Sequence, residues 1–187
     1  MCSSDLMNAA LALALAAELG VSVAAARRGL AACRPAKGRL QHEALGGIHL
    51  IDDTYNANPA SMRAAFGTLA ALPVVGRRIV VVGDMAELGV HAGPAHVGVG
   101  QDARELGMDM VFATGNHAAQ VQAGAAGGRT AFRTCPDVAA TVAVLLEEAR
   151  AGDALLFKAS RSSRLERVVE GLKAVLVGKR GPATGVQ

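Results

Sequence analysis

The chain has 187 residues, 51% of them apolar, and its 19 Lys and Arg residues against 16 Asp and Glu give a net charge of +3. This length fits one domain, or one domain with a fragment of another, and the composition is the opposite of a disordered one. The longest uncharged apolar run, Ala9–Ala17, has nine residues, whereas a membrane span needs about 20. Because Asp5 and no Lys or Arg precede this run, we do not expect a signal peptide either.

Neither a nucleic acid nor a membrane is an expected partner. With no Trp and one Tyr, the chain lacks the mixture of aromatic and basic residues on which single-strand binders stack bases. Its cysteines, Cys2, Cys33 and Cys135, are too widely spaced for a disulfide framework or a C-x-x-C metal site. We interpret them as thiols of a reducing, cytoplasmic compartment.

The first part of the chain predicts two helices. An Ala/Leu-rich helix is expected over residues 8–20, ending at Gly20, and a second over Ser22–Cys33 with Ser22 as its N-cap. The break Arg34–Gly38, with sequence RPAKG, predicts a domain boundary. Met1–Leu6 fits no expected element, and we interpret it as an artefact of the gene model with no part in function.

After this break, short apolar strands alternate with longer helical stretches. Strands are expected at Ile48–Ile51, Arg78–Val82, Met110–Ala113, Thr130–Arg133 and Ala154–Lys158. Helices are expected at Ser61–Ala71, Ala95–Leu106, His117–Ala126, Pro136–Ala151 and Ser163–Val177. The alternation predicts an α/β fold with a mostly parallel sheet and helices on both faces.

Ligands of such sheets bind at the carboxyl ends of the strands. That rule selects the loops Asp52–Pro59, Gly83–Gly89, Thr114–His117 and Ala159–Ser163. The first of them, DDTYNANP, offers carboxylates and carboxamides to hydroxyl or ammonium groups. The alternative is a capped loop in which Pro59 opens the next helix.

Two further loops carry chemistry. In VGDMAELG, Asp84 and Glu87 could accept from an amine or hold a magnesium-bound water, whereas helix N-capping by Asp84 is the alternative. In KASR, Lys158, Ser160 and Arg161 predict an anion site at a helix N-terminus. The alternative is that Arg161 belongs to a solvated helix stripe.

Other patterns do not support a site. Gly98–Ala103 matches G-x-G-x-x-A, but it lies inside an expected helix, so we do not expect a dinucleotide site there. His91 and His96 lack the spacing of a metal-binding pair, and no metal site is predicted. The sequence contains no G-x-x-x-x-G-K-[ST] phosphate loop.

Taken together, the sequence runs resemble one family. They are Gly38-Arg39-Leu40, DDTYNANP followed by Ser61-Met62, VGDMAELG followed by His96, and KASR followed by Glu166. The chain resembles the Mur ligases over residues 7–178, and within them the members that add D-alanyl-D-alanine. The resemblance implies a Rossmann-like lid domain at residues 37–187, preceded at residues 1–36 by the helical tail of a central ATPase domain.

The resemblance also implies a reaction. These ligases use ATP and Mg²⁺ to join UDP-MurNAc-tripeptide and D-Ala-D-Ala through an acyl phosphate, and a monomer is expected. The phosphate loop, the magnesium ligands and a modified lysine would lie upstream, so we expect this chain alone to be inactive.

Residue roles follow by position within the family's motifs. Asn8 resembles the residue that contacts adenine, and Arg39 and Asp53 resemble those that reach the nucleotide phosphates and ribose. Arg39 and Lys158 would be catalytic. The residues expected to bind the incoming amino substrate are Asn56, Asn58, Asp84, Glu87, Lys158, Ser160 and Arg161.

Three alternatives stay open. One is the lid of another ligase, either a folylpolyglutamate synthase or a Mur ligase that adds a single amino acid. The second is a stand-alone, non-catalytic binding module. The third, a Rossmann dehydrogenase, is weakened because no Gly-rich turn follows the first strand.

Overall fold

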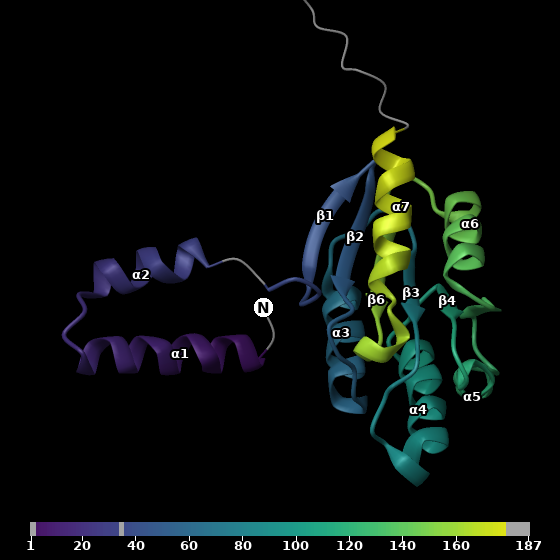
Figure 1. Ribbon diagram of the computed structural model, residues 1–187, viewed down its shortest axis with the longest axis horizontal. Coiled ribbons are helices and arrows are strands. Elements are labelled where there is room, and N and C mark those ends of the chain that lie inside the picture. The colour runs from purple at the N-terminus through teal and green to yellow at the C-terminus, as the bar shows by residue number, and fades with distance from the viewer. Residues whose placement is uncertain (1–2, 34–35, 179–187) are drawn as a thin grey trace, which may run out of the picture. The chain divides into compact units, whose positions relative to one another are not determined.

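The computed structural model describes residues 3–33 and 36–178. The chain divides into two compact units, Met1–Ala36 and Lys37–Gln187, which are described separately (Figure 1). Arg34 and Pro35 of the expected boundary lie outside the described residues. No helix in the described ranges is both long enough and apolar enough to cross a bilayer.

The first unit is a pair of helices, α1 (Ser3–Glu18) and α2 (Val23–Ala32). Ser22 caps α2 as predicted, because its side chain accepts from the backbone N–H of Ala25 at 3.3 Å. The interpretation of Met1–Leu6 as a segment without an element is wrong from Ser3 onward. A helix nucleated by the Ala/Leu run also gains a hydrogen bond with each residue added toward the N-terminus.

The second unit is built on a six-stranded sheet with the order β1-β2-β6-β3-β4-β5. Only β1 and β2 pair in antiparallel fashion, and all other neighbours are parallel, which confirms the mostly parallel sheet. The strands are β1 (Gln41–Leu45), β2 (Ile48–Asp53), β3 (Arg78–Val82), β4 (Met110–Ala113), β5 (Ala131–Thr134) and β6 (Ala154–Lys158).

β1 was not expected from the sequence. Gln41, His42 and Glu43 are polar, Ala44 is exposed, and Leu45 at the end is buried. It forms a hairpin with β2 through Gly46 and Gly47, whose φ angles of 60° and 80° suit the tight turn that joins twisted strands.

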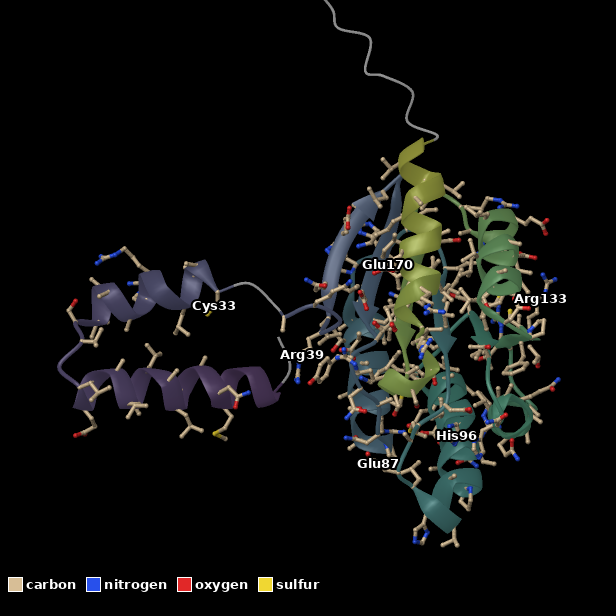
Figure 2. All side chains as sticks on the ribbon, viewed as in Figure 1. Cys33, Arg39, Glu87, His96, Arg133 and Glu170 are labelled. Atoms are coloured by element: carbon tan, nitrogen blue, oxygen red, sulfur yellow. The ribbon has the colours of Figure 1, made fainter. Side chains whose placement is uncertain are left out.

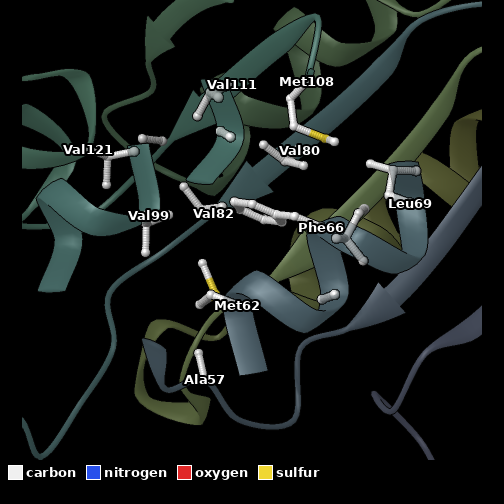
Figure 3. Packing of buried hydrophobic residues seen from close by; sticks show 14 of the residues in the cluster. Ala57, Met62, Phe66, Leu69, Val80, Val82, Val99, Met108, Val111 and Val121 are labelled. Atoms are coloured by element: carbon white, nitrogen blue, oxygen red, sulfur yellow. The ribbon is translucent and has the colours of Figure 1, made fainter. Parts of the chain in front are cut away.

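Helices cover both faces of the sheet, as predicted. On one face lie α3 (Pro59–Ala71), α4 (Ala92–Glu105) and α5 (Ala118–Ala125), and on the other α6 (Val138–Glu148) and α7 (Glu166–Gly178). Alternate residues of a strand serve opposite cores: Val80 and Val82 pack with Phe66 of α3, whereas Val81 packs with Leu172 of α7. Figure 3 shows Phe66 between Val82 and Leu69 in the first core.

The G-x-G-x-x-A run lies inside α4 and serves helix packing. A Cβ on Gly100 would lie 2.0 Å from the carbonyl oxygen of Val121 in α5. A Cβ on Gly124 of α5 would lie 1.9 Å from the carbonyl oxygen of Val97. These glycines therefore allow the two backbones to approach one another.

Candidate functional site

The site is built where β6 enters the sheet between β2 and β3. In this register Lys158, the last residue of β6, lies opposite both Asp53 and Val82. The three loops that leave these strands therefore start side by side at the carboxyl edge of the sheet. Consecutive strands β2 and β3 are separated here by another strand, which is where doubly wound sheets bind their ligands.

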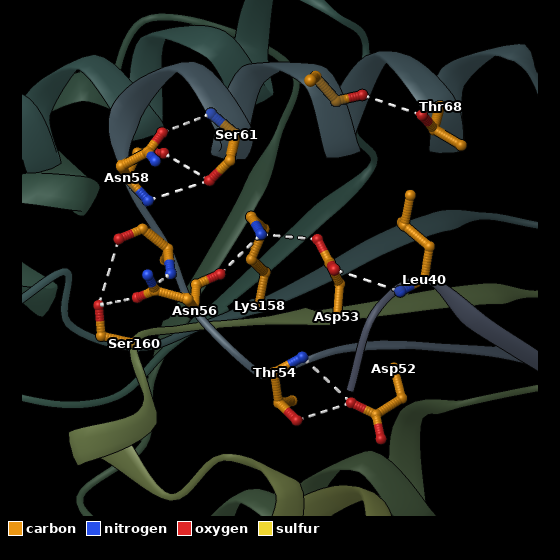
Figure 4. Close-up of polar contacts among 12 residues, drawn as sticks. Leu40, Asp52, Asp53, Thr54, Asn56, Asn58, Ser61, Thr68, Lys158 and Ser160 are labelled. Carbon is orange, nitrogen blue, oxygen red and sulfur yellow. Dashed lines mark hydrogen bonds and ion pairs between the residues drawn. The ribbon is translucent and has the colours of Figure 1, made fainter. Parts of the chain in front are cut away.

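Lys158 is a buried residue that connects two of these loops. Its Nζ donates to Asp53 Oδ2 at 2.6 Å and to the Asn56 carbonyl at 2.9 Å, and its side chain is only 3% exposed (Figure 4). Asp53 also accepts from the Leu40 N–H at 3.2 Å. Burial raises the pKa of Asp53, and the hydrogen bond from Lys158 opposes that rise. The predicted cation lies at a buried strand end, but its ammonium group already has protein partners.

Ser160 ties together all three loops. Its hydroxyl accepts from the Ala86 N–H at 2.9 Å and lies 3.2 Å from the Ala57 carbonyl. Its backbone N–H donates to the Asp84 carbonyl at 3.0 Å. The residue is 2% exposed, and its hydroxyl is already used to hold the loops together.

Asp84 anchors the loop after β4. Its carboxylate accepts from the backbone N–H groups of Asn116 and His117 at 2.9 and 3.0 Å and lies 3.1 Å from His117 Nδ1. Burial opposes ionisation of this group, but these hydrogen bonds outweigh it and lower the pKa of Asp84. Asp84 thus supports the segment that leads into α5. A Cβ on Gly115 would lie 2.7 Å from its Cγ.

Asp84, His96 and His117 bring their ligand atoms within 4.8 Å of one another. The Nε2 of His96 accepts from the Met85 N–H at 2.9 Å, and its Nδ1 lies 2.7 Å from the Ala92 carbonyl. Both ring nitrogens are therefore used, and no lone pair of His96 points to a metal. Burial lowers the pKa of His96, in keeping with a neutral ring.

The carboxylates at this edge do not fit a magnesium ion of their own. Asp52 accepts from Thr54, Asp53 is paired with Lys158, and Asp84 accepts three hydrogen bonds. Mg²⁺ prefers free carboxylates and retained waters in octahedral geometry. Glu87 is the exposed carboxylate of this edge, and this single donor gives no reason to place the ion on this unit.

An open groove of about 410 Å³ lies next to Asn56 and Ser160. It is lined by Asn56, Ala57, Asn58, Ala86, Glu87, Leu88, Ser160, Arg161 and Ser162. Glu87 and Arg161 are its charged side chains, and Glu87 is held at a φ of 64°. Asn58 also caps α3, since its Oδ1 accepts from the Ser61 N–H at 2.8 Å. Helix capping is therefore confirmed for Asn58, and its role in binding the amino substrate stays a prediction.

Arg39 reaches the same edge from the segment before β1. Its guanidinium lies 4.2 Å from the centre of the Tyr55 ring, and that of Arg161 lies 5.8 Å from it. Arg39 and Glu87 both lie toward this end of the sheet (Figure 2). Asn8 is an exposed residue of the first unit, so its predicted role at the nucleotide stays a prediction.

The family model for the Mur ligase, glutamate ligase domain, matches residues 38–161. This chain belongs to the Mur ligase family. The matched range starts at Gly38, includes Arg39 and Asp53, and ends at Arg161. It therefore covers the edge described above.

Relatives within the Mur ligases cover nearly the whole chain. The UDP-N-acetylmuramoyl-tripeptide–D-alanyl-D-alanine ligase of Escherichia coli (strain K12) is 38% identical over 172 residues, which are 90% of this chain and 37% of the relative. The corresponding ligase of Bacillus subtilis (strain 168) is 33% identical with the same coverage. The chain thus spans little more than a third of the curated relatives it matches.

Solved structures agree with this family and with the Rossmann-like fold. A crystal structure of MurF ligase from Thermotoga maritima in complex with ADP superposes with a TM-score of 0.80 at 28% identity. The match covers 96% of this chain and 40% of that one.

Among the predicted Mur ligase site residues, the structure gathers Asn56, Asn58, Glu87, Ser160 and Arg161 around one groove. Arg39, Asp53, Asp84 and Lys158 belong to the same edge but do not line the groove, and Asn8 belongs to the first unit. The sequence did not single out Tyr55 as a separate contact. The feature that could have indicated Tyr55 is that it is an aromatic residue inside a polar loop, in a chain with few aromatic residues.

Proposed function

We propose that the chain is the C-terminal lid portion of an ATP-dependent ligase that adds D-Ala-D-Ala to UDP-MurNAc-tripeptide. The relatives named above carry this activity in their names and match the chain over 90% of its length. The observation that carries the proposal is the groove, which presents Glu87 and Arg161 with opposite charges. A zwitterionic dipeptide has an ammonium group for the first and a carboxylate for the second.

The proposed reaction has two steps. ATP phosphorylates the terminal carboxylate of the tripeptide, and the dipeptide amine then attacks the acyl phosphate to form the amide, with release of phosphate. The lid contributes by holding the amine near the acyl phosphate, which raises its effective concentration, and by keeping water from a hydrolysable intermediate. Arg39 adds positive charge where phosphoryl charge develops.

The structure favours a changed role for Lys158. Because its ammonium is bound to Asp53 and Asn56, we propose that it holds the β2 and β6 loops in place and does not contact substrate. Asp84 has a comparable role toward the loop before α5. Arg161, which is exposed, is then the cation proposed to bind the dipeptide carboxylate.

We further propose that residues 1–36 are the end of the central ATPase domain. Several apolar side chains of α1 are more than half exposed, among them Met7, Leu11 and Leu15 at 63%, 63% and 62%, as expected for helices that pack on a larger domain. The phosphate loop and the magnesium ligands would come from that domain. The free thiols Cys33 and Cys135 fit a reducing compartment, and we place the reaction in the cytoplasm.

The test is a ligation assay on the complete protein that contains this chain. We expect phosphate release that requires UDP-MurNAc-tripeptide, ATP and D-Ala-D-Ala together. Replacing the dipeptide by single amino acids, glutamate included, should abolish the reaction. Equal activity with a single amino acid would assign the chain to a different ligase of the family, and no ligation at all would favour a binding module.

A further inference from the structure

Tyr55 carries two arginines that come from distant parts of the chain. Tyr55 is 43% exposed, and the Arg39 guanidinium lies 4.2 Å and the Arg161 guanidinium 5.8 Å from the centre of its ring. Both distances lie within the range in which an aromatic ring attracts a cation. Arg39 precedes β1, whereas Arg161 follows β6.

The backbone around Arg39 is fixed to the same loop. The Tyr55 N–H donates to the Gly38 carbonyl at 2.9 Å, and the Leu40 N–H donates to Asp53 Oδ1 at 3.2 Å. Gly38 has a φ of 71°, and a Cβ there would lie 3.0 Å from the Tyr55 nitrogen. The backbone on both sides of Arg39 is therefore hydrogen-bonded to residues at or just after the end of β2. The position of the Arg39 side chain then depends on its own contacts.

The segment that carries Arg161 is fixed in a comparable way. Lys158 binds Asp53 across the two strands, and the hydroxyl of Ser160 accepts from Ala86. Arg161 begins the short 3-10 turn that follows, Arg161–Ser163. Both arginines thus start from rigid backbone on either side of Tyr55.

Neither guanidinium forms an ion pair with a carboxylate anywhere in residues 3–33 and 36–178. Two like charges beside one ring repel each other, and the negative face of the ring offsets only part of that repulsion. A doubly charged anion would offset the rest, and guanidinium groups suit phosphate geometry. Asp53 is paired with Lys158, and Glu87, which lines the groove together with Arg161, forms no ion pair with either arginine.

We propose that Tyr55 is a positioning residue that holds Arg39 and Arg161 together as one two-arginine site for a phosphoryl dianion. A guanidinium has five N–H donors, so Arg161 keeps N–H groups for the dipeptide carboxylate assigned to it above. The ring contacts no reacting atom and acts only through the guanidinium groups. The contacts of Arg39 and Arg161 with the Tyr55 ring support the pairing of the two arginines. Only the identity of the anion, the phosphoryl group in transit from nucleotide to acceptor, rests on the proposed function.

The chain offers a direct optical test, because Tyr55 is its one tyrosine and it has no tryptophan. The near-ultraviolet circular dichroism and the fluorescence of tyrosine therefore report on this ring alone. We expect Arg39→Met and Arg161→Met each to change both signals, while Arg167→Met, at an exposed residue of α7, leaves them unchanged. Wild-type spectra in both Arg39→Met and Arg161→Met would overturn the proposal.

A second arm measures binding of inorganic phosphate to the chain by ³¹P NMR at low salt. We expect each arginine variant to weaken binding about tenfold, the loss of one charge-assisted contact. Tyr55→Leu removes no charge and should still weaken binding several-fold, and Tyr55→Phe should restore it. Far-ultraviolet circular dichroism confirms that each variant is folded.

The outcomes separate this inference from the proposed function. No phosphate binding by the wild-type chain, or wild-type binding by Tyr55→Leu, would overturn the two-arginine site. If phosphate binding follows the expected pattern but the complete protein ligates nothing, the site stands and the proposed function fails.

Discussion

The carboxyl edge of the sheet has two parts that look alike in sequence and differ in structure. In the buried part, Asp53, Lys158 and Ser160 bind one another or backbone groups of neighbouring loops. In the open part, Arg39, Tyr55, Glu87 and Arg161 are exposed.

This difference shows that one polar motif can contribute both to stability and to ligand binding. A charge buried at a strand end must be paired, because an unpaired one is costly. Charges on the loop surface cost little and can be left for a ligand. The buried part should therefore control stability and the open part binding, and the following predictions test that division.

The largest effect is expected from Lys158→Met. The change leaves Asp53, whose side chain is 14% exposed, without its cation, and should lower the free energy of unfolding by about 3–5 kcal/mol. Lys173→Met is the matched control, because the side chains of its ion pair with Glu43 are 32% and 47% exposed and the pair should contribute less than about 1 kcal/mol. Urea denaturation of the chain measures both, and similar small losses would contradict a structural role for Lys158.

Ser160→Ala should come next. It removes the acceptor of the Ala86 N–H and the donor to the Ala57 carbonyl and should cost about 1–3 kcal/mol, as for two lost hydrogen bonds. Ser162→Ala, at an exposed neighbour in the same turn, should change stability by less than about 0.5 kcal/mol. If the two serine variants denature at the same urea concentration, the hydroxyl of Ser160 does not tie the loops together.

The pH dependence of stability should report on His96. Burial lowers its pKa from the ordinary 6.5, so the unfolded chain binds the proton more tightly than the folded one. Stability should be fully present above pH 6.5 and decline as the pH falls through the lowered pKa, by about 1 kcal/mol if the Met85 hydrogen bond is lost. His96→Gln should remove the decline seen in urea titrations at several pH values, and His91→Gln, at an exposed site, should keep it.

A smaller effect of opposite sign is expected from Glu87→Gly. Glu87 has a φ of 64°, a conformation that strains residues with a Cβ, so glycine should raise stability by up to about 1 kcal/mol. The same change removes the carboxylate from the groove and should weaken dipeptide binding in the complete protein. Glu147→Gly, within α6, should instead lower stability. A destabilised Glu87→Gly would show that the side chain supports the fold.

The sequence predicted the core of the fold well and its edge poorly. β3, β4 and β6 have the predicted bounds, because continuous runs of apolar residues belong to strands buried on both faces. β1 was missed because most of its side chains are exposed, and an edge strand needs no apolar pattern. The adjacent Gly46-Gly47 was the signal that could have revealed the hairpin.

The position of the groove was predicted, but the partners of its neighbouring side chains were not. The rule that loops gather at the carboxyl ends of parallel strands identified the groove. It could not tell which polar groups already have partners. Lys158 pairs with Asp53, 105 positions earlier in the chain. A contact between residues so far apart in sequence depends on the strand order. The stacking of Tyr55 with Arg39 and Arg161 depends on the same order.

The smallest effect on stability, and the largest on function, is expected at Arg39. Its guanidinium is exposed and contacts the Tyr55 ring, so Arg39→Ala should change the free energy of unfolding of the chain by less than about 0.5 kcal/mol. In the complete protein the same change should lower turnover about 100-fold, since a cation placed at developing phosphoryl charge acts mainly in the transition state. Its effect on KM should be smaller. Steady-state kinetics of the complete protein and urea denaturation of the chain measure the two effects, and unchanged turnover with lost stability would reverse the roles assigned to the two parts of the edge.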